Sequence, residues 1–390
     1  MFSDRLPEHA EPNALTRALA RLLGAGIPIV DLTESNPTRA GIPYPKELLA
    51  PLAGPRALQY EPHPRGLASA REAVAADHAR RGTVVDPEHV VLAASTSEAY
   101  GWLFKLLCNP GECVLVPRPS YPLFELLARF EGIRAEPYDL DYSTRWEIDF
   151  ASIEAAPADA RAVLVVSPNN PTGSYVSARE VERLARLCRL RGWALVSDEV
   201  FADYPLDATL DVTAPLTDLA TRADCLSFTL AGFSKSLGLP QLKLGWIVAG
   251  GPPALRDQAL SALELIADSY LSVGTPVQVA APLLLARGGD VRNAIHARTR
   301  TNLACLRESA AGTPACEVLR VEGGWSAVIR VPASRSEEEI VLDLLDRERV
   351  LVHPGYFFDF ASEAYIVVSL LCPPDIFAGA IPRVLRAVSS

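Results

Sequence analysis

The chain has 390 residues, of which 49% are apolar and 7% aromatic, and it carries a formal net charge of −10. This length and composition predict two packed domains and argue against a disordered chain. The acidic balance and the absence of a basic run exclude a nucleic-acid partner, because phosphate contacts need clustered Lys and Arg.

Export and membrane insertion are not expected. The opening segment, MFSDRLPEHAEPN, has acidic residues where a signal peptide needs a positive and then an apolar stretch. The best apolar candidate, GWLFKLLC, is far shorter than the roughly 20 residues of a membrane span and contains Lys105. Seven cysteines are widely spread, without CxxC spacing or His partners, which predicts reduced thiols and no metal site. We therefore expect a soluble, cytoplasmic protein.

In chain order, a helix is expected at residues 14–26, followed by a Pro-rich segment that ends near Pro45. Short β-branched runs then alternate with helical patterns up to residue 250. The expected strands are 89–95, 112–117, 162–167, 193–199, 225–234 and 244–250, and the helices between them include 98–107, 123–130 and 178–190. This alternation predicts an α/β fold with a mainly parallel sheet of the seven-stranded type, sandwiched by helices.

The pattern changes after residue 253. Long helical stretches at 254–270 and 277–311 are followed by a strand-like run at 323–332, a helix at 336–349, a strand at 365–371 and a closing helix at 376–388. These elements predict a smaller α+β domain, with the second long stretch as a connecting helix. We expect a large domain of residues 46–289 and a discontinuous small domain of residues 1–45 and 290–390.

Polar clusters follow several of the expected strands, at 95–98, 118–121, 167–173 and 197–199. In open α/β sheets ligands bind beyond the carboxyl ends of the strands, so these clusters are expected to converge on one crevice. That crevice is the predicted active site.

Lys235 is the central candidate in that crevice. It follows the strand-like CLSFTLAG and precedes a loop with Gly and Pro. Burial near apolar strands would lower the pKa of its amine and free it for Schiff-base formation, although a single lysine is more commonly a solvated surface charge. Asp198 ends WALVSD and can place a carboxylate against a protonated pyridine nitrogen, or simply cap a turn.

Three further features fit a phosphate-bearing pyridine cofactor. Asn170 in SPNNPTG can hydrogen-bond a ring hydroxyl, although the segment also reads as a plain turn. Ser95, Thr96 and Ser97 stand where a helix begins, a position that favours an anion, and STSE is equally a capping motif. Tyr121 in RPSYP can offer an aromatic face, or belong to the core.

With these motifs in this order, the sequence resembles the class I/II aminotransferases of the aspartate aminotransferase superfamily, over about residues 30 to 385. The resemblance implies pyridoxal phosphate (PLP) as cofactor, a Schiff base on the catalytic Lys235, and Asp198 paired with the pyridinium. It also implies that Asn170 binds the ring hydroxyl and Tyr121 stacks on the ring. The residues implied to hold the phosphate are Ser95, Thr96, Ser97 and Ser234.

The resemblance further implies a homodimer with shared active sites. Tyr60, in QYEPHPRG, is similar to the family's tyrosine that reaches the phosphate of the neighbouring subunit's cofactor.

The sequence departs from the family pattern at four positions. Lys243 stands where an arginine is usual, eight residues after the catalytic lysine, and offers the phosphate a point charge in place of a planar fork. Gly232 replaces a phosphate-contacting serine. Phe201 replaces a tyrosine that assists Asn170 at the ring hydroxyl. Val367 stands where an arginine usually clamps the substrate carboxylate.

Another cation must replace that arginine, or the substrate is not an ordinary α-amino acid. Arg39, in ESNPTRAG, is the candidate substitute, together with Asn170 as a substrate contact, and a surface arginine is the alternative. Arg330 and His353 are weaker candidates, and His353 is expected to anchor a loop of the small domain.

The predicted function is transamination between a small-molecule amino donor, an amino acid or amine, and a keto-acid acceptor. Two other readings stay open. A PLP-dependent β-eliminating lyase of the C–S lyase type uses the same core machinery. A non-catalytic PLP-binding module is weakened by the absence of an attached DNA-binding domain.

Overall fold

The computed structural model describes residues 2–7, 11–207, 222 and 224–389. Its main feature is an eight-stranded sheet in the order β2-β9-β8-β7-β6-β3-β4-β5. The five strands β8, β7, β6, β3 and β4 run parallel, whereas β9 is antiparallel to both its neighbours and β5 is antiparallel to β4. The strand bounds are β2 Val90–Ala93, β3 Cys113–Arg118, β4 Arg134–Tyr142, β5 Trp146–Ile148, β6 Ala160–Val166, β7 Ala194–Asp198, β8 Ser227–Gly232 and β9 Gly245–Gly250.

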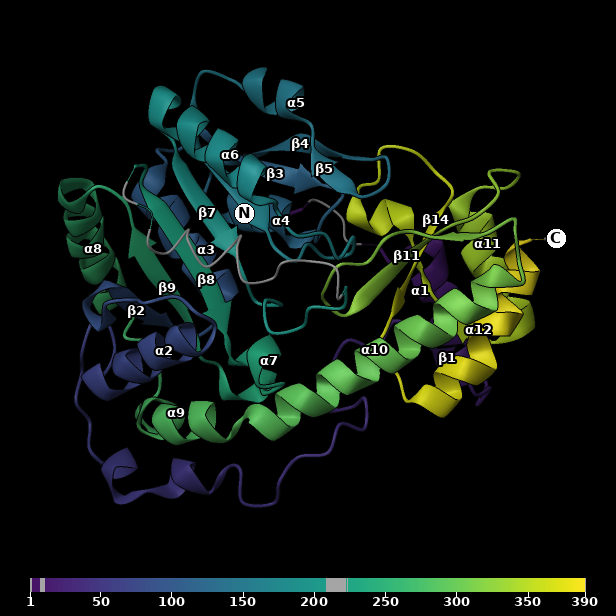
Figure 1. Cartoon of the computed structure of the whole chain (residues 1–390), viewed down its shortest axis with the longest axis horizontal. Helices are drawn as coiled ribbons and strands as arrows, with labels where there is room; N and C mark the ends of the chain where they lie inside the picture. The colour runs from purple at the N-terminus through teal and green to yellow at the C-terminus, as the bar shows by residue number, and fades with distance from the viewer. Residues whose placement is uncertain (1, 8–10, 208–221, 223, 390) are drawn as a thin grey trace.

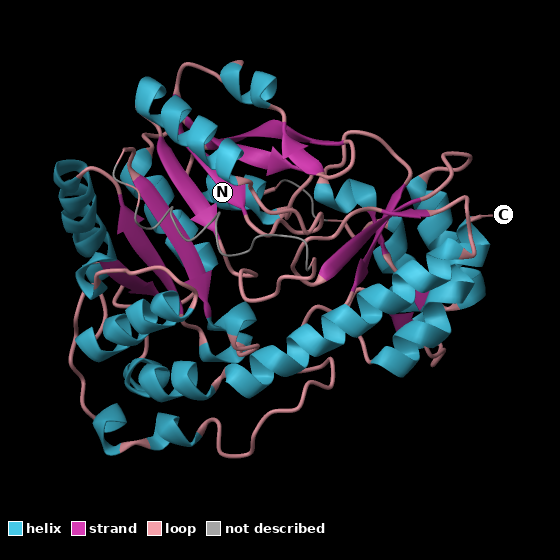
Figure 2. Cartoon of the chain, viewed as in Figure 1, coloured by secondary structure: helices cyan, strands magenta, loops and turns pink. Residues whose placement is uncertain are grey.

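Helices cover both faces of this sheet, as Figures 1 and 2 show. Alternate side chains of one strand enter different cores: Val91 packs in one hydrophobic cluster, and Leu92 in another on the opposite face. This two-sided burial explains why the strands read as continuous apolar runs. The covering helices are α2 Ala68–Arg80, α3 Thr96–Leu107, α4 Leu123–Phe130, α5 Phe150–Glu154, α6 Ala178–Arg191, α8 Pro253–Asp268 and α9 Thr275–Arg287. The predicted α/β architecture is thus confirmed, and β4 and the short β5 are strands that were not expected from the sequence.

A second core lies at the C-terminal side. A four-stranded antiparallel sheet has the order β10-β11-β14-β13, and β1 pairs in parallel with β12. The strand bounds are β1 Val30–Asp31, β10 Glu317–Val318, β11 Ser326–Arg330, β12 Val350–Leu351, β13 His353–Pro354 and β14 Tyr365–Ser369. The helices that pack there are α1 Ala14–Gly24, α11 Glu337–Asp343 and α12 Pro374–Val388.

The helix α10, Gly289–Ala311, joins the two cores (Figure 1). Its Ile295 packs with the large-sheet core and its Leu306 with the C-terminal core. The expected single stretch 277–311 is in fact two helices, because the chain turns at Gly288 between α9 and α10. A Cβ atom at Gly288 would lie 2.1 Å from Leu237 Cδ2, so only glycine permits this approach.

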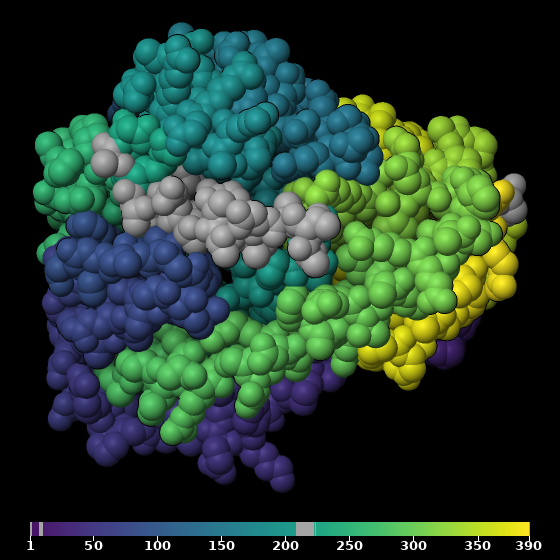
Figure 3. Space-filling view, in the orientation of Figure 1, coloured from purple at the N-terminus to yellow at the C-terminus, as the bar shows by residue number. Residues whose placement is uncertain are grey.

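The early part of the chain lies along the lower edge of the molecule, against α9 and α10 (Figure 3, purple against green). Ala40 and Ile42 pack in the large-sheet core, whereas Leu15, Leu22 and Leu32 pack in the C-terminal core. The division into residues 46–289 and residues 1–45 with 290–390 stays a prediction. No helix in the described part of the chain has the length and apolar character needed to span a bilayer.

Candidate active site

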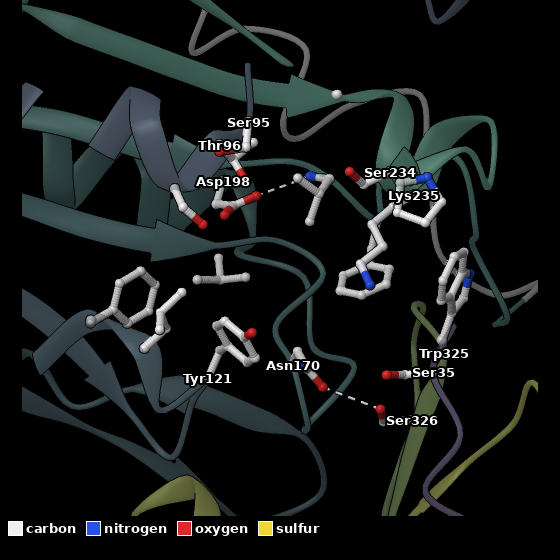
Figure 4. A pocket seen from close by; sticks show the side chains of 18 of the residues that line it. Ser35, Ser95, Thr96, Tyr121, Asn170, Asp198, Ser234, Lys235, Trp325 and Ser326 are labelled. Atoms are coloured by element: carbon white, nitrogen blue, oxygen red, sulfur yellow. Dashed lines mark hydrogen bonds between the residues drawn. The ribbon is translucent and has the colours of Figure 1, made fainter. Parts of the chain in front are cut away.

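A cavity of about 410 Å³ opens beyond the carboxyl ends of the parallel strands, where the polar clusters were expected to converge. Side chains from both cores line it (Figure 4). Ten of the predicted site residues are among them: Ser95, Thr96, Ser97, Tyr121, Asn170, Asp198, Phe201, Ser234, Lys235 and Lys243.

Lys235 lies in the short helix α7, Phe233–Ser236, which follows β8 directly. Its Nζ atom is 5.5 Å from the ring centroid of Phe201 and 5.0 Å from that of Trp325. Burial lowers the pKa of this amine, and the charge of Asp198 opposes the effect. The backbone is held in place because the Tyr204 hydroxyl donates to the Lys235 carbonyl at 2.7 Å. A buried amine with a lowered pKa is in the neutral form, which can act as a nucleophile or accept a proton, more often than a surface lysine is.

Asp198 ends β7 and is buried. Its carboxylate accepts a hydrogen bond from the Tyr100 hydroxyl at 2.9 Å and another from the Val200 amide at 3.1 Å. Burial raises the pKa of Asp198 to about 6, and these two bonds and the charge of Lys235 oppose that rise. A buried carboxylate fixed by two donors is suited to hold a positive charge on a bound ring nitrogen.

The end of the cavity that lies at the start of α3 is suited to an anion. Ser95 is the N-cap of α3, and its Oγ atom accepts from the Glu98 amide at 3.1 Å, so the capping interpretation of this motif is correct. Thr96 and Ser97 form the first turn, where backbone amides are free. A Cβ atom at Gly245 would lie 3.1 Å from the Thr96 amide nitrogen, so glycine there lets β9 approach this helix start closely.

The presence of glycine at position 232, where the family commonly has serine, has a physical reason in this chain. A Cβ atom at this position would lie 2.9 Å from the Leu244 carbonyl oxygen and 3.0 Å from the Gly245 Cα atom. The close packing of β8 against β9 therefore excludes a side chain. The hydroxyl of Ser234 lies on the same cavity wall.

The opposite end of the cavity has walls from both cores. Asn170 lies opposite Ser326, and the Ser326 hydroxyl donates to Asn170 Oδ1 at 3.2 Å (Figure 4). The neighbouring Asn169 connects the two loops that carry Tyr121 and Asn170, because it accepts from Ser120 Oγ at 2.8 Å and donates to the Pro119 carbonyl at 2.9 Å.

Two predicted residues lie outside the cavity. Tyr60 is 75% exposed and lines a separate small depression. The Arg39 side chain is 75% exposed, and its Nε atom is 3.3 Å from Glu34 Oε2. Of the weaker candidates, Arg330 is exposed and pairs with Glu317, whereas His353 does line the cavity. The roles of Tyr60 and Arg39 stay predictions.

Sequence reasoning missed several lining residues. Tyr100 reads as an apolar position of its helix, and Trp325 is 90 residues from Lys235 in the chain. Ser35 enters the cavity from the segment after β1, which is anchored because the Ser369 hydroxyl donates to the Glu34 carbonyl at 2.7 Å. Only the fold brings these residues together.

The cavity fits the cofactor implied by the sequence. PLP presents a phosphate, an aldehyde and a pyridine nitrogen, and the cavity offers each a chemical complement. The hydroxyls at the start of α3 and Lys243 suit the phosphate, the amine of Lys235 suits the aldehyde, and the buried carboxylate of Asp198 suits the ring nitrogen.

Comparisons with known proteins show the family to which this chain belongs. The family model for aminotransferase class I and II matches residues 29–371. The chain is 26% identical to glutamate-pyruvate aminotransferase AlaA of Haemophilus influenzae, over 95% of this chain and 93% of that protein. It is 31% identical to S-alkyl-thiohydroximate lyase SUR1 of Arabidopsis thaliana, over 57% of this chain and 48% of that protein.

Solved structures show the same fold. An aminotransferase from Escherichia coli has a TM-score of 0.86 at 24% identity, covering 100% of this chain and 98% of the other. Alanine aminotransferase from Pyrococcus furiosus has a TM-score of 0.87 at 22% identity, covering 99% of both chains.

Proposed function

Because this chain belongs to the class I and II aminotransferases, and so is a PLP-dependent transaminase, we propose that Lys235 is its catalytic lysine and that the cavity residues around it hold the cofactor. The observation that carries this proposal is the buried amine of Lys235 in the same cavity as the buried carboxylate of Asp198. The substrates are a small-molecule amino donor and a keto-acid acceptor.

When bound, PLP supplies an aldehyde that condenses with amines and a protonated ring that withdraws electrons from the substrate carbon. In our proposal the Lys235 amine would hold the cofactor through its aldehyde. With a substrate bound, Lys235 Nζ would take the proton from the carbon that bears the amino group and later return a proton. Burial favours the neutral amine, which is the form that accepts a proton.

Asp198 keeps the ring nitrogen charged in this proposal. The carboxylate cannot turn away, because Tyr100 and the Val200 amide each hold it by a hydrogen bond. A positive ring nitrogen in contact with Asp198 would stabilise the ionised carboxylate against the cost of its burial.

We assign the phosphate to Ser95, Thr96, Ser97, Ser234 and Lys243, and the opposite ring edge to Asn170 and Tyr121. The start of α3 offers free amides and a favourable dipole to an anion. Lys243 adds a single point charge, so it positions the phosphate less rigidly than an arginine would.

Borohydride reduction of the holoenzyme tests the assignment of Lys235. We expect the peptide that contains Lys235, and no other peptide, to gain the mass of the reduced cofactor. A Lys235→Ala variant is the control, and it is expected to release the cofactor on denaturation. A label on another lysine would refute the assignment.

A homodimer with shared active sites is the second part of the proposal. Leu58 is 91% exposed and Tyr60 75% exposed, and exposed apolar side chains in one segment mark an interface. Sedimentation of the purified protein should give twice the chain mass. A mixture of Lys235→Ala and Tyr60→Phe proteins should be more active than either alone, because one site of each mixed dimer is intact.

β-Elimination is the second candidate function, favoured by the partial likeness to the SUR1 lyase. The two reactions part only after Lys235 has removed the proton. A lyase releases ammonia and a keto acid from a substrate with a β leaving group without any acceptor, whereas a transaminase needs the acceptor to turn over.

We also propose that the protein works in a reducing compartment, the cytoplasm. All seven cysteines are free, and burial raises the pKa of Cys108 and Cys372 to about 12. Free, unreactive thiols are typical of such compartments. Fractionation of the native cells would test this.

A further inference from the structure

Three neighbouring strands of the small sheet form one wall of the active-site cavity. In the antiparallel register His353 is paired with Val367, and Ser326 with Ser369. Paired residues point to the same face of a sheet, as do residues two apart on one strand. All four side chains therefore lie on one face, and all four line the cavity. We call these four residues the strand wall.

The strand wall carries no arginine or lysine. Among the described residues that line the whole cavity, the cations are Lys235 and Lys243. Lys235 serves the reaction, and Lys243 is two residues from Gly245, which packs against the start of α3 at the opposite end. A carboxylate placed on the strand wall would therefore leave water without meeting a positive charge from the described lining residues of this chain, which is unfavourable.

The hydroxyl protons of the strand wall are already used. Ser326 donates to Asn170 Oδ1 at 3.2 Å, and Ser369 donates to the Glu34 carbonyl at 2.7 Å. Toward a ligand Ser326 therefore offers lone pairs, and Ser369 offers one, because its Oγ atom also accepts from the Leu371 amide at 3.1 Å. These lone pairs need a donor. A carboxylate has only acceptors, whereas a carboxamide or hydroxyl group has a donor as well.

His353 is the remaining polar side chain of the strand wall, and it can offer a ligand both a donor and an acceptor. Its ring packs against Phe357 and Phe358, each with a centroid distance of 5.7 Å. In the described part of the chain neither ring nitrogen has a hydrogen-bond partner. Burial lowers the pKa of His353, and the charge of Asp31 opposes this. A neutral imidazole offers one donor and one acceptor, the pair that a carboxamide or hydroxyl group also offers.

We propose that the preferred amino donor presents a neutral polar group of the carboxamide or hydroxyl class, in place of a carboxylate, to the strand wall, and that His353 is the residue that selects it. This rests on the proposed function of the cavity. On this proposal the keto-acid acceptor, whose carboxylate faces no cation among the described lining residues, binds weakly.

The test compares matched donors that differ in one group, such as an amino acid, its amide and its amino alcohol, for leucine, alanine and phenylalanine side chains. The change of the cofactor absorbance of the holoenzyme gives kcat/KM for each. We expect the neutral donors to exceed the amino acids by about 10-fold or more, because a carboxylate buried on the strand wall would lose its hydration without gaining a partner. Amino acids favoured by the same factor would overturn the proposal.

Variants separate charge from shape. Val367→Arg should shift the preference toward carboxylate donors and lower the KM of the keto acid by about 10- to 100-fold. Val367→Met is the matched control, because it adds length without charge and should leave the preference unchanged. His353→Phe should raise the KM of neutral donors about 10-fold, and His353→Asn should restore part of the loss. If His353→Phe leaves the preference for neutral donors unchanged, His353 does not select the donor.

Binding of unreactive analogues keeps this test separate from the function itself. Calorimetry with the holoenzyme measures the dissociation constants of 4-methylpentanoate and its amide, which lack the amino group. Tighter binding of the amide supports the strand wall even if no donor converts the cofactor, an outcome that would refute transamination alone. Tighter binding of the acid, lost in Arg39→Ala, would assign the recognition to Arg39 and refute our proposal.

Discussion

The replacement Asp198→Asn is expected to stabilise the protein without its cofactor. The pKa of this carboxyl rises from 3.8 to about 6 because it is buried. The folded protein therefore binds a proton more tightly than the unfolded chain, and stability falls as the pH rises from 3.8 through 6. This difference of about two units corresponds to about 3 kcal/mol above pH 7, once the carboxylate is ionised in both states.

An asparagine has almost the same shape and cannot ionise. Its amide can keep partners in the Tyr100 hydroxyl and the Val200 amide, which hold the carboxylate of the native protein at 2.9 and 3.1 Å. The gain of the variant should therefore be near zero at pH 4, where Asp198 is protonated, and should approach about 3 kcal/mol above pH 7.

Urea unfolding of the apoprotein at several pH values between 4 and 8 measures this gain. The matched control is Asp257→Asn, an exposed carboxylate paired with Arg256, whose removal should change the free energy of unfolding by about 0.5 kcal/mol or less at every pH. The reasoning would be refuted by a gain that does not vary with pH, or by a variant less stable than the native protein at pH 8. Either result would show that burial does not raise the pKa of Asp198. The same variant should bind the cofactor more weakly.

Three further predictions concern the surroundings of Lys235. Gly288→Ala should lower the free energy of unfolding by about 1 to 3 kcal/mol, because its Cβ atom would displace Leu237. Since Leu237 is two residues after the lysine, the cofactor absorbance should shift as well. An unchanged urea midpoint would contradict this. Phe201→Tyr should lower the pH at which the holoenzyme absorbance changes, since a hydroxyl would assist Asn170, and a higher midpoint in the variant would refute it. Tyr204→Phe removes the bond to the Lys235 carbonyl and should lower the free energy of unfolding by about 1 kcal/mol, measured in urea; no change would mean that another donor takes over.

The large sheet was predictable from the sequence because its strands are buried on both faces. A continuous β-branched run such as AVLVVS is typical of a strand buried on both faces. Parallel strands end at a common edge of the sheet, which is why Asp198, Asn170 and Lys235 meet there. The nine-residue β4, RAEPYDLDY, and the short β5 lack such a run, and both were missed. The division of the helical stretch at Gly288 depends on a contact with Leu237, which no local pattern contains.

The wall opposite the lysine was much harder to predict. Trp325, Ser326 and His353 reach the cavity through pairing between strands far apart in the chain, and sequence reasoning placed His353 in a loop of the small domain. Tyr100 was missed because its hydroxyl is one polar atom on a helix that otherwise reads as core.

The helix α10 enters both cores, so its stiffness determines how the two walls of the catalytic cavity face each other. Ile295 and Leu306 are anchored in different halves of the molecule, and at 1.5 Å per residue they are about 16 Å apart along α10. A stiff rod of that length moves its far end by about 1.4 Å when it tilts by about 5°. Since such a shift at a reacting centre can change a rate by about 100-fold, the rigidity of this rod sets how reproducibly the two walls of the cavity face each other.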